Sequence, residues 1–428
     1  TRCLSDWSSD VCSSDLGRME GERVPEALWG LDRFEARRKA VELFREVGHL
    51  VKEEDYTIAL ATCSRCGTPI EYAIFPQWWL RMRPLAEEVL KGLRRGDIAF
   101  VPERWKKVNM DWLESVKDWN ISRQLWWGHQ IPAWYCEDCQ AVNVPRPERY
   151  LEDPTSCEAC GSPRLKRDED VFDTWFSSAL WPLSTLGWPE ETEDLKAFYP
   201  GDVLVTGYDI LFLWVSRMEV SGYHFMGERP FKTVLLHGLV LDEKGQKMSK
   251  SKGNVIDPLE MVERYGADAL RFALIYLATG GQDIRLDLRW LEMARNFANK
   301  LYNAARFVLL SREGFQAKED TPTLADRFMR SRLSRGVEEI TALYEALDLA
   351  QAAREIYELV WSEFCDWYLE AAKPALKAGN AHTLRTLEEV LAVLLKLLHP
   401  MMPFLTSELY QALTGKEELA LEAWPEPG

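Results

Sequence analysis

The sequence predicts an α/β domain with a metal-supported insertion, followed by an all-α helical bundle. Apolar runs at 202–206 and 232–241 have the length of buried strands, and a helical stretch separates them. Cys-x-x-Cys pairs recur in the first half of the chain. Beyond Asp257 helical periodicity is nearly continuous. Strands alternating with helices favour a parallel sheet, which the bundle then follows.

The composition is that of a folded globular chain with more than one domain. Its 428 residues suffice for two to four domains, and 46% hydrophobic with 28% charged residues excludes an intrinsically disordered protein. No apolar run reaches the ~20 residues of a membrane span and no secretory signal is present, so we expect a cytoplasmic protein. The net charge of −16 argues against a protein that coats nucleic acid, but a specific RNA binder with local basic patches stays open.

The first sixteen residues differ from the rest of the chain. Thr1 to Leu16 repeat Ser, Asp and Cys without a helical or strand period, and we interpret them as a foreign segment. Cys3 and Cys12 are therefore left out of the metal argument.

Helices and a loop region precede the two strands. Helical spacing runs from Leu31 to His49, and a second short helix spans Met82 to Leu93. Residues 56–80 are strand-like and loop-like. Residues 118–165 combine Trp, Gly, Pro and two Cys pairs, as in a loop region supported by metal. A helix from about Asp209 to Phe225 completes the strand–helix–strand unit.

The last third of the chain predicts a helical bundle, with breaks at Gly280-Gly281, Gly314 and Pro322. Neither an internal repeat nor a low-complexity tract is found outside residues 1–16. The predicted helices are 258–279, 287–312, 323–346, 348–373, 380–398 and 403–414.

Two Cys-x-x-Cys pairs separated by 17 residues have the spacing of a structural zinc site. Each pair presents two thiolates from one tight turn, and four soft ligands suit a closed tetrahedral Zn²⁺ site. No ligand position is left open, which disfavours a catalytic zinc. Redox pairs or unrelated buried cysteines are the alternative. The predicted ligands are Cys136, Cys139, Cys157 and Cys160.

Cys63 and Cys66 form a third pair without a partner pair in the sequence. They are either a redox motif or half of a second metal site. Cys365 lies in a helical apolar pattern and is expected in the core.

The motif with the clearest chemistry is Lys-Met-Ser-Lys-Ser at Lys247–Ser251, bracketed by Gly245 and Gly253. Two ammonium groups and two hydroxyls can neutralise and hydrogen-bond a polyphosphate leaving group. A loop delivered by a strand and flanked by glycines can close on the transition state. A solvated charge run is the alternative, which the position after a strand disfavours.

At these residues the sequence resembles class I aminoacyl-tRNA synthetases. Lys247–Ser251 looks like the lysine signature of the class, and Tyr265–Arg271 resembles the helix start that follows it. Trp119–Pro132 is similar to a segment shared by the valine, isoleucine and leucine enzymes, and its Asn120 and Gly128-His129-Gln130 resemble the valine-specific branch.

Four further segments resemble the valine-specific branch, two of them in the catalytic part and two in its anticodon-binding bundle. They are Val171–Ser178, Gly207–Trp214, Asn296–Arg306 and His399–Phe404. The resemblance covers residues 17–428.

The resemblance implies a Rossmann-like catalytic domain that activates L-valine with ATP and Mg²⁺ to an adenylate and transfers it to the cognate tRNA. On the family pattern Lys250 is the principal contact to the ATP phosphates, with Lys247 and Ser249 assisting. Met248 and Ser251 belong to the same ATP and catalytic site. A monomer is expected.

The family pattern also places the amino-acid pocket. Asp209 would hold the ammonium of valine through a charge-assisted bond. Trp175, Ile210 and Trp214 would wall a small apolar cavity, which rejects larger side chains but cannot strongly exclude threonine. A helix N-cap is the alternative role for Asp209 and plain core packing the alternative for both tryptophans. For His129 we expect a structural hydrogen bond.

The resemblance divides the chain into regions. Residues 17–57 resemble the trailing edge of an editing domain, and 58–256 the C-terminal part of the catalytic domain, with a zinc-binding insertion at 133–166. A stem-contact region at 257–290 and the anticodon-binding bundle at 291–428 follow. The N-terminal half with its His-x-Gly-His signature and the coiled-coil arm are expected to be missing. We therefore expect an incomplete Rossmann-like domain that is inactive alone.

Three alternatives remain at this point. The isoleucine enzyme shares class and mechanism, although Trp175 and Asn120 favour valine. A non-catalytic, zinc-containing tRNA-binding protein would keep the bundle without an active site. An unrelated zinc-ribbon scaffold does not explain the order of the motifs. The synthetase interpretation requires that the Lys250 loop and the Asp209 pocket meet at one cleft at the strand ends.

Overall fold

The computed structural model describes residues 17–21, 24–57, 59–62, 67–70, 76–248 and 253–428. The chain forms two compact units. One runs to Trp79 and includes Asn120–Ser122, and the other comprises Leu80–Trp119 and Arg123–Gly428. Within the described residues, helices long and apolar enough to cross a membrane are absent. The segment interpreted as foreign, together with Cys63 and Cys66, lies outside the described residues.

The first unit contains η1 (Glu26–Leu28) and the predicted N-terminal helix, α2 (Arg33–Glu46). Asp32 caps α2 by accepting a hydrogen bond from the Phe34 amide at 2.9 Å. The strand-like stretch 56–80 yields little regular structure: within its described residues, strand is assigned only to β1 (Trp79–Leu80), besides a single bridge between Thr62 and Pro69.

The second unit is built on a parallel sheet of β2 (Ala99–Val101), β10 (Phe231–His237) and β9 (Gly201–Gly207), in the order β2-β10-β9. The predicted strand 202–206 is confirmed as β9. The predicted strand 232–241 is confirmed only to His237, as β10, because the strand breaks at Gly238 and Val240–Leu241 pair in a different sheet. β2 was not predicted, because a run of three residues carries too little periodicity.

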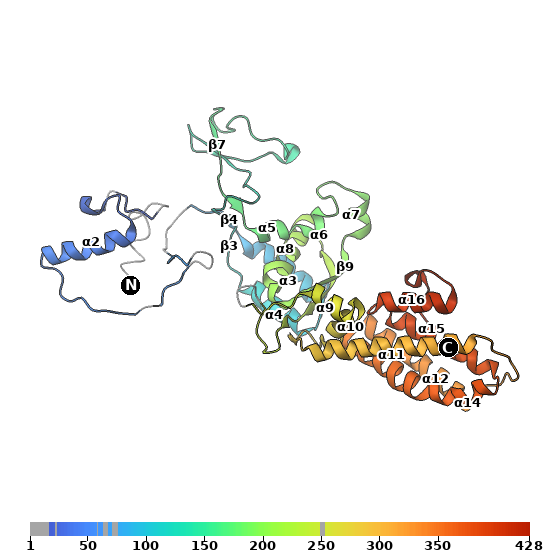
Figure 1. The fold of residues 1–428 in the computed structure, drawn as a ribbon. Helices are drawn as coiled ribbons and strands as arrows, with labels where there is room; N and C mark the ends of the chain where they lie inside the picture. Colours follow the sequence, from blue (N-terminus) through green and yellow to red (C-terminus); the bar gives the residue numbers. More distant parts are fainter. Residues whose placement is uncertain (1–16, 22–23, 58, 63–66, 71–75, 249–252) are drawn as a thin grey trace. The chain divides into compact units, whose positions relative to one another are not determined.

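Helices α3 (Met82–Arg95), α4 (Arg104–Glu114) and α8 (Ser216–Met226) bury one face of this sheet (Figure 1). Leu204, Val234 and Leu236 point into that core and are almost fully buried. The predicted helix 209–225 is correct in position but not in type, since the chain passes through a 3-10 turn, η3 (Tyr208–Ile210), and a π turn, η4 (Leu211–Val215), before α8.

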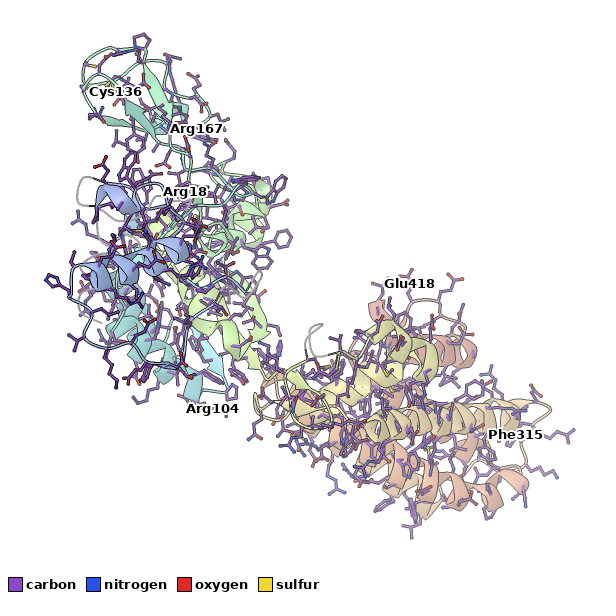
Figure 2. The ribbon with its side chains drawn as sticks, turned by 60° about the vertical axis from the view of Figure 1, so that its left-hand side comes forward. Arg18, Arg104, Cys136, Arg167, Phe315 and Glu418 are labelled. Atoms are coloured by element: carbon purple, nitrogen blue, oxygen red, sulfur yellow. The ribbon has the colours of Figure 1, made fainter. Side chains whose placement is uncertain are left out.

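Short elements connect the sheet to a small lobe that carries the cysteines. The lobe is a sheet in the order β6-β5-β7, and Figure 2 labels Cys136 and Arg167 on it. The elements of this part of the chain, the connecting ones and those of the lobe together, are in chain order β3 (Trp119–Asn120), β4 (Ser122–Arg123), β5 (Trp134–Cys136), β6 (Val142–Asn143), η2 (Pro147–Arg149), β7 (Leu165–Arg167), β8 (Val171–Phe172), α5 (Thr174–Ser178), α6 (Trp181–Ser184) and α7 (Glu193–Phe198).

Beyond Asp257 the chain is helical as predicted (Figure 1), except for the short strand β12 (Ile284–Arg285), which pairs in parallel with β11 (Val240–Leu241). The predicted helix 258–279 is divided at Gly266, whose φ of +92° no regular helix accommodates. The helices are α9 (Pro258–Tyr265), α10 (Ala267–Leu277), α11 (Leu288–Arg312), α12 (Leu324–Glu345), α13 (Leu349–Glu358), the π-helical η6 (Leu359–Tyr368), α14 (Leu369–Lys377), α15 (Ala381–Leu398), α16 (Pro403–Thr414) and η7 (Leu419–Leu421).

Two of the motifs that resemble the synthetase family, Tyr265–Arg271 and His399–Phe404, are joined by hydrogen bonds in the helical part. Asp268, on α10, accepts hydrogen bonds from the amides of Phe404 and Leu405 at 3.3 and 2.6 Å, at the start of α16. Arg271 donates to the carbonyls of Pro400 and Met401 at 3.1 and 3.3 Å. A carboxylate at the N-terminus of a helix and a guanidinium on the preceding carbonyls fix the turn into α16. These motif residues therefore have a structural role.

Asp326 is a buried carboxylate that ties three helices of the bundle together. It forms a capping box with Thr323 at the start of α12. Tyr368 and Thr383 donate their hydroxyl hydrogens to it at 2.6 and 2.9 Å. Burial alone would raise the pKa of Asp326, but the hydrogen bonds from Tyr368, Thr323 and Thr383 bring it below its ordinary value.

Candidate functional site

Asp209 lies directly after the carboxyl end of β9, where ligands bind in open parallel α/β sheets. A Cβ on Gly207 would come within 2.7 Å of the Asp209 carboxylate, so glycine is needed for this close approach. The side chain of Asp209 is 36% exposed and forms no capping hydrogen bond at η3, η4 or α8. The N-cap alternative is therefore wrong.

Lys247 brings the lysine loop to the same strand end. Its Nζ lies 4.0 Å from Asp209 Oδ2, with 71% of the lysine side chain exposed. Lys247 and Met248 are the described members of the motif, whereas Ser249, Lys250 and Ser251 lie outside the described residues. Lys247 therefore places the described part of the loop beside Asp209, the carboxylate that is expected to bind the ammonium group.

The two ends of the lysine loop are tied together by Asp242 and Asn254. Asn254 Nδ2 donates to Asp242 Oδ2 at 2.8 Å, and the amides of Lys244 and Gln246 donate to Asp242 Oδ1 at 3.0 and 2.7 Å. The hydrogen bond from Asn254 is the largest of several effects that lower the pKa of Asp242. This clamp positions the base of the loop beside the strand ends.

The backbone that follows β10 is also fixed in position, by a close backbone contact and by hydrogen bonds. A Cβ on Gly238 would come within 1.9 Å of the backbone oxygen of Gln282, so only glycine fits there. Asp283 accepts from the Leu239 amide at 2.8 Å and from the Tyr208 hydroxyl at 3.1 Å. The 3-10 turn that carries Asp209 is thereby fastened to the chain that leaves β10.

The expected pocket residues Trp175, Ile210 and Trp214 are all half-buried, and the helix of Trp175, α5, packs against η4. Trp214 Nε1 donates to the Ser178 carbonyl at 3.1 Å, and its ring lies 5.7 Å from that of Trp181. Neither Trp175 nor Trp214 belongs to the fully buried core. Their role as pocket walls stays a prediction.

Asp173 is a functional-site support that sequence reasoning missed. It is 6% exposed and caps α5 through the Trp175 amide at 3.0 Å. Trp119 Nε1 donates to it at 3.1 Å and Arg123 at 2.5 Å. Its only local signal is an aspartate placed before a helix start. Two recognised motifs, around Trp119 and Trp175, are thus joined through one carboxylate.

Arg217 completes this arrangement around Asp173. Its guanidinium lies 3.7 Å from the centre of the Trp119 ring and 4.0 Å from the Asp173 carboxylate. Burial lowers the pKa of Arg217, with Asp173 opposing that effect. Nearby, His129 Nδ1 and Ser177 Oγ are 2.6 Å apart, which agrees with the structural hydrogen bond expected for His129.

Glu219 on α8 is a fully buried carboxyl group behind the η4 turn. It accepts a hydrogen bond from Asn109 Nδ2 at 2.8 Å, while its other oxygen has no partner among the described residues. Burial raises the pKa of Glu219 to about 8, against the opposing effect of Asn109. Glu219 is therefore mainly neutral at pH 7.

We expect this proton to make stability depend on pH. The folded state keeps a proton that the unfolded state releases from its ordinary pKa of 4.5, so stability falls as pH rises from there to about 8. Glu219→Gln should match the original protein at pH 5 and exceed its free energy of unfolding by about 4 kcal/mol at pH 8.5. Chemical denaturation at both pH values measures this, and equal slopes for the two proteins would contradict it.

The four cysteines predicted as zinc ligands come together in the β6-β5-β7 lobe. Their sulfurs all lie within 4.8 Å of one another, and Cys136–Cys160 and Cys139–Cys157 are each 3.6 Å apart. Four sulfurs around a tetrahedral zinc lie roughly 3.8 Å apart, given a Zn–S bond of about 2.3 Å. The donor set therefore fits a four-thiolate zinc site.

Each cysteine pair sits in a tight turn whose amides point at sulfur. Gly161 has a φ of +75° in one turn, but Gln140 takes the equivalent left-handed conformation in the other, with a φ of +60°. Against the effect of burial, backbone hydrogen bonds from Cys160 and Ala159 lower the pKa of Cys157 to about 6. A thiolate is the form that binds metal.

Comparisons with known proteins agree with this geometry. Residues 7–287 match the family model "tRNA synthetases class I (I, L, M and V)", and residues 326–428 match "Anticodon-binding domain of tRNA ligase". The chain is 99% identical over 412 residues to valine–tRNA ligase of Thermus thermophilus, covering 96% of the chain and 48% of that protein. For Thermotoga maritima valine–tRNA ligase, identity is 52% over 401 residues, covering 93% and 46%. The chain thus spans about half the length of the curated relatives it matches.

Solved structures share the fold at low sequence identity. Mycobacterium tuberculosis methionyl-tRNA synthetase in complex with methionyl-adenylate gives a TM-score of 0.64 at 20% identity, covering 82% of this chain and 65% of that one. A leucyl-tRNA synthetase complex from Agrobacterium radiobacter K84 gives 0.60 at 23% identity, covering 73% and 42%. Both likenesses concern the fold alone.

Proposed function

Because the chain belongs to the class I tRNA synthetases of the I, L, M and V group, we propose that it supplies the amino-acid pocket and the phosphate-binding loop of a valine–tRNA ligase. The reaction joins L-valine to its tRNA through an aminoacyl-adenylate, with ATP consumed to AMP and diphosphate. The observation that carries this proposal is the 4.0 Å approach of Lys247 to Asp209 at the strand ends.

Opposite charges at the strand end suit the two charged parts of the substrates. Asp209 binds the ammonium group of valine, because a half-exposed carboxylate with no hydrogen-bonding role in capping is free for a charged ligand. Lys247 and Lys250 neutralise the phosphates of ATP, which is bound with Mg²⁺, and Met248, Ser249 and Ser251 belong to the same phosphate-binding loop. The Asp242–Asn254 clamp supports this role, since it holds the base of the loop.

Specificity for valine follows from the walls of the pocket. In this proposal Trp175, Ile210 and Trp214 are the walls of a small apolar pocket for the valine side chain, which would exclude larger side chains by volume. The 99% identity to a valine–tRNA ligase supports valine over isoleucine.

The four-cysteine cluster holds a structural zinc ion. Cys136, Cys139, Cys157 and Cys160 supply all four thiolate ligands, so the ion braces the lobe and leaves no position for a substrate. The helical region from 291 onward is proposed to bind the anticodon stem of the tRNA, supported by the match of residues 326–428.

Titration of the ¹⁵N-labelled chain with a non-hydrolysable valyl-adenylate analogue tests the function. We expect the indole signals of Trp175 and Trp214 to shift, with an affinity about a hundredfold above that for the isoleucyl analogue. A preference for the isoleucyl analogue would favour an isoleucine enzyme. Binding of tRNA without binding of either analogue would favour a non-catalytic tRNA-binding protein.

A further inference from the structure

The π turn η4 separates Asp209 from the regular helix α8 and carries Trp214. Its defining hydrogen bond runs from the Ser216 amide to the Leu211 carbonyl, five residues back. The Ser216 hydroxyl also lies 3.1 Å from that carbonyl. One wide turn is thus inserted directly behind the residues expected to contact valine.

A buried hydrogen-bond chain from another helix supports this turn. Ser216 Oγ is 2.6 Å from Asn109 Oδ1 on α4, so its single hydrogen is shared between Asn109 and the Leu211 carbonyl, with Asn109 the closer acceptor. Asn109 in turn donates to Glu219 at 2.8 Å. Asn109, Ser216 and Glu219 are each 0% exposed.

Because these three side chains are buried, each of them is restricted to its present hydrogen-bond partners. Polar groups removed from water need their partners, so Ser216 cannot rotate away from Asn109 without leaving groups unsatisfied. In a regular α-helix the Leu211 carbonyl would instead accept from the Val215 amide. Anchoring Ser216 to α4 therefore favours the wide turn over the regular one.

We propose that Asn109, Ser216 and Glu219 are positioning residues for the amino-acid pocket, and that their buried hydrogen-bond chain sets the π turn presenting Ile210 and Trp214 to the substrate. The inference rests on the proposed function, in which these two side chains wall the pocket. It predicts that the network controls the shape of the pocket and not only the stability of the core.

Ser216→Ala tests the proposal, because it removes one hydroxyl group and adds no atoms that the core would have to accommodate. A readout free of substrate is the solvent exchange of the Trp214 indole hydrogen, which is bonded to the Ser178 carbonyl at 3.1 Å. We expect exchange to quicken and the affinity for the valyl-adenylate analogue to fall, each on the order of tenfold, together with a smaller preference for valine over isoleucine.

Thr406→Ala is the matched control. Thr406 is equally buried and its hydroxyl donates to the Met402 carbonyl four residues back, but it lies on α16. We expect it to lower stability without changing Trp214 exchange or analogue selectivity. If Ser216→Ala does not fold, Ser216→Cys keeps a weak donor of similar size and should give a smaller change in the same direction.

Unchanged Trp214 exchange and unchanged selectivity in a folded Ser216 variant would overturn the positioning role. If the original chain binds neither adenylate analogue, the proposed function fails. In that case the exchange measurement alone decides whether the network sets the turn, so the two failures are distinguishable.

Discussion

Replacing Asp209 by asparagine is expected to weaken binding of the valyl-adenylate analogue about a hundredfold, because a charge-assisted hydrogen bond to the ammonium is lost. Stability should hardly change. The Asp209–Lys247 pair is 4.0 Å apart with side chains 36% and 71% exposed, and such pairs contribute little to folding. Titration and thermal unfolding of the same variant separate the two effects.

Asp202→Asn is the matched control for this experiment. Asp202 lies at the opposite end of the same strand, β9, and pairs with Lys232 at 2.6 Å, while its side chain is 83% exposed. Its replacement should leave both affinity and unfolding temperature unchanged. An Asp209→Asn variant that binds the analogue as tightly as the original chain would show that the ammonium is held elsewhere.

The parts of the fold that the sequence predicted are those with local signals. Strands β9 and β10 contain the short apolar runs 203–205 and 234–236, and α11 and α16 keep one helical period from end to end. The cysteine spacing predicted the four-sulfur cluster because ligand spacing within a turn is itself a local property.

The features that escaped prediction depend on partners distant in sequence. The π turn at Leu211–Val215 looks like ordinary helix in its periodicity, because the widening is supported by Asn109, about a hundred residues earlier. Likewise, Asp173 gathers Trp119 and Arg123, some fifty residues upstream. Such contacts leave no periodic trace in the sequence, so the supports of the site could be found only in three dimensions.

Asp209 and Lys247 show both what the sequence could predict about the site and what it left open. The motifs identified each residue, and the strand that precedes each one predicted a common edge of the sheet. Sequence left open whether Asp209 capped a helix instead. Gly207 decides that question, since its missing side chain lets the Asp209 carboxylate turn back over the strand end.

Removal of zinc is expected to unfold the β6-β5-β7 lobe while the rest of the chain stays folded. A folding unit shorter than roughly 40 residues usually needs a metal ion, a disulfide or oligomerisation to be stable. The predicted insertion at 133–166 is below this size. Its described core is small, with Trp134, Cys136 and Cys157 among its few buried side chains. Structural zinc sites of this kind bind with about 10–16 kcal/mol, so metal binding dominates the stability of such a lobe.

Elemental analysis of freshly purified reduced protein should find close to one zinc per chain, and Cys157→Ser should lose it. Amide signals of 133–167 should then collapse in the NMR spectrum, while those of the helical bundle persist. Cys365→Ala is the control, because Cys365 is a buried thiol in the bundle, away from the cluster. Its zinc content should equal that of the original chain. Absence of zinc from the original chain, or its full retention in Cys157→Ser, would contradict a site built from these four thiolates.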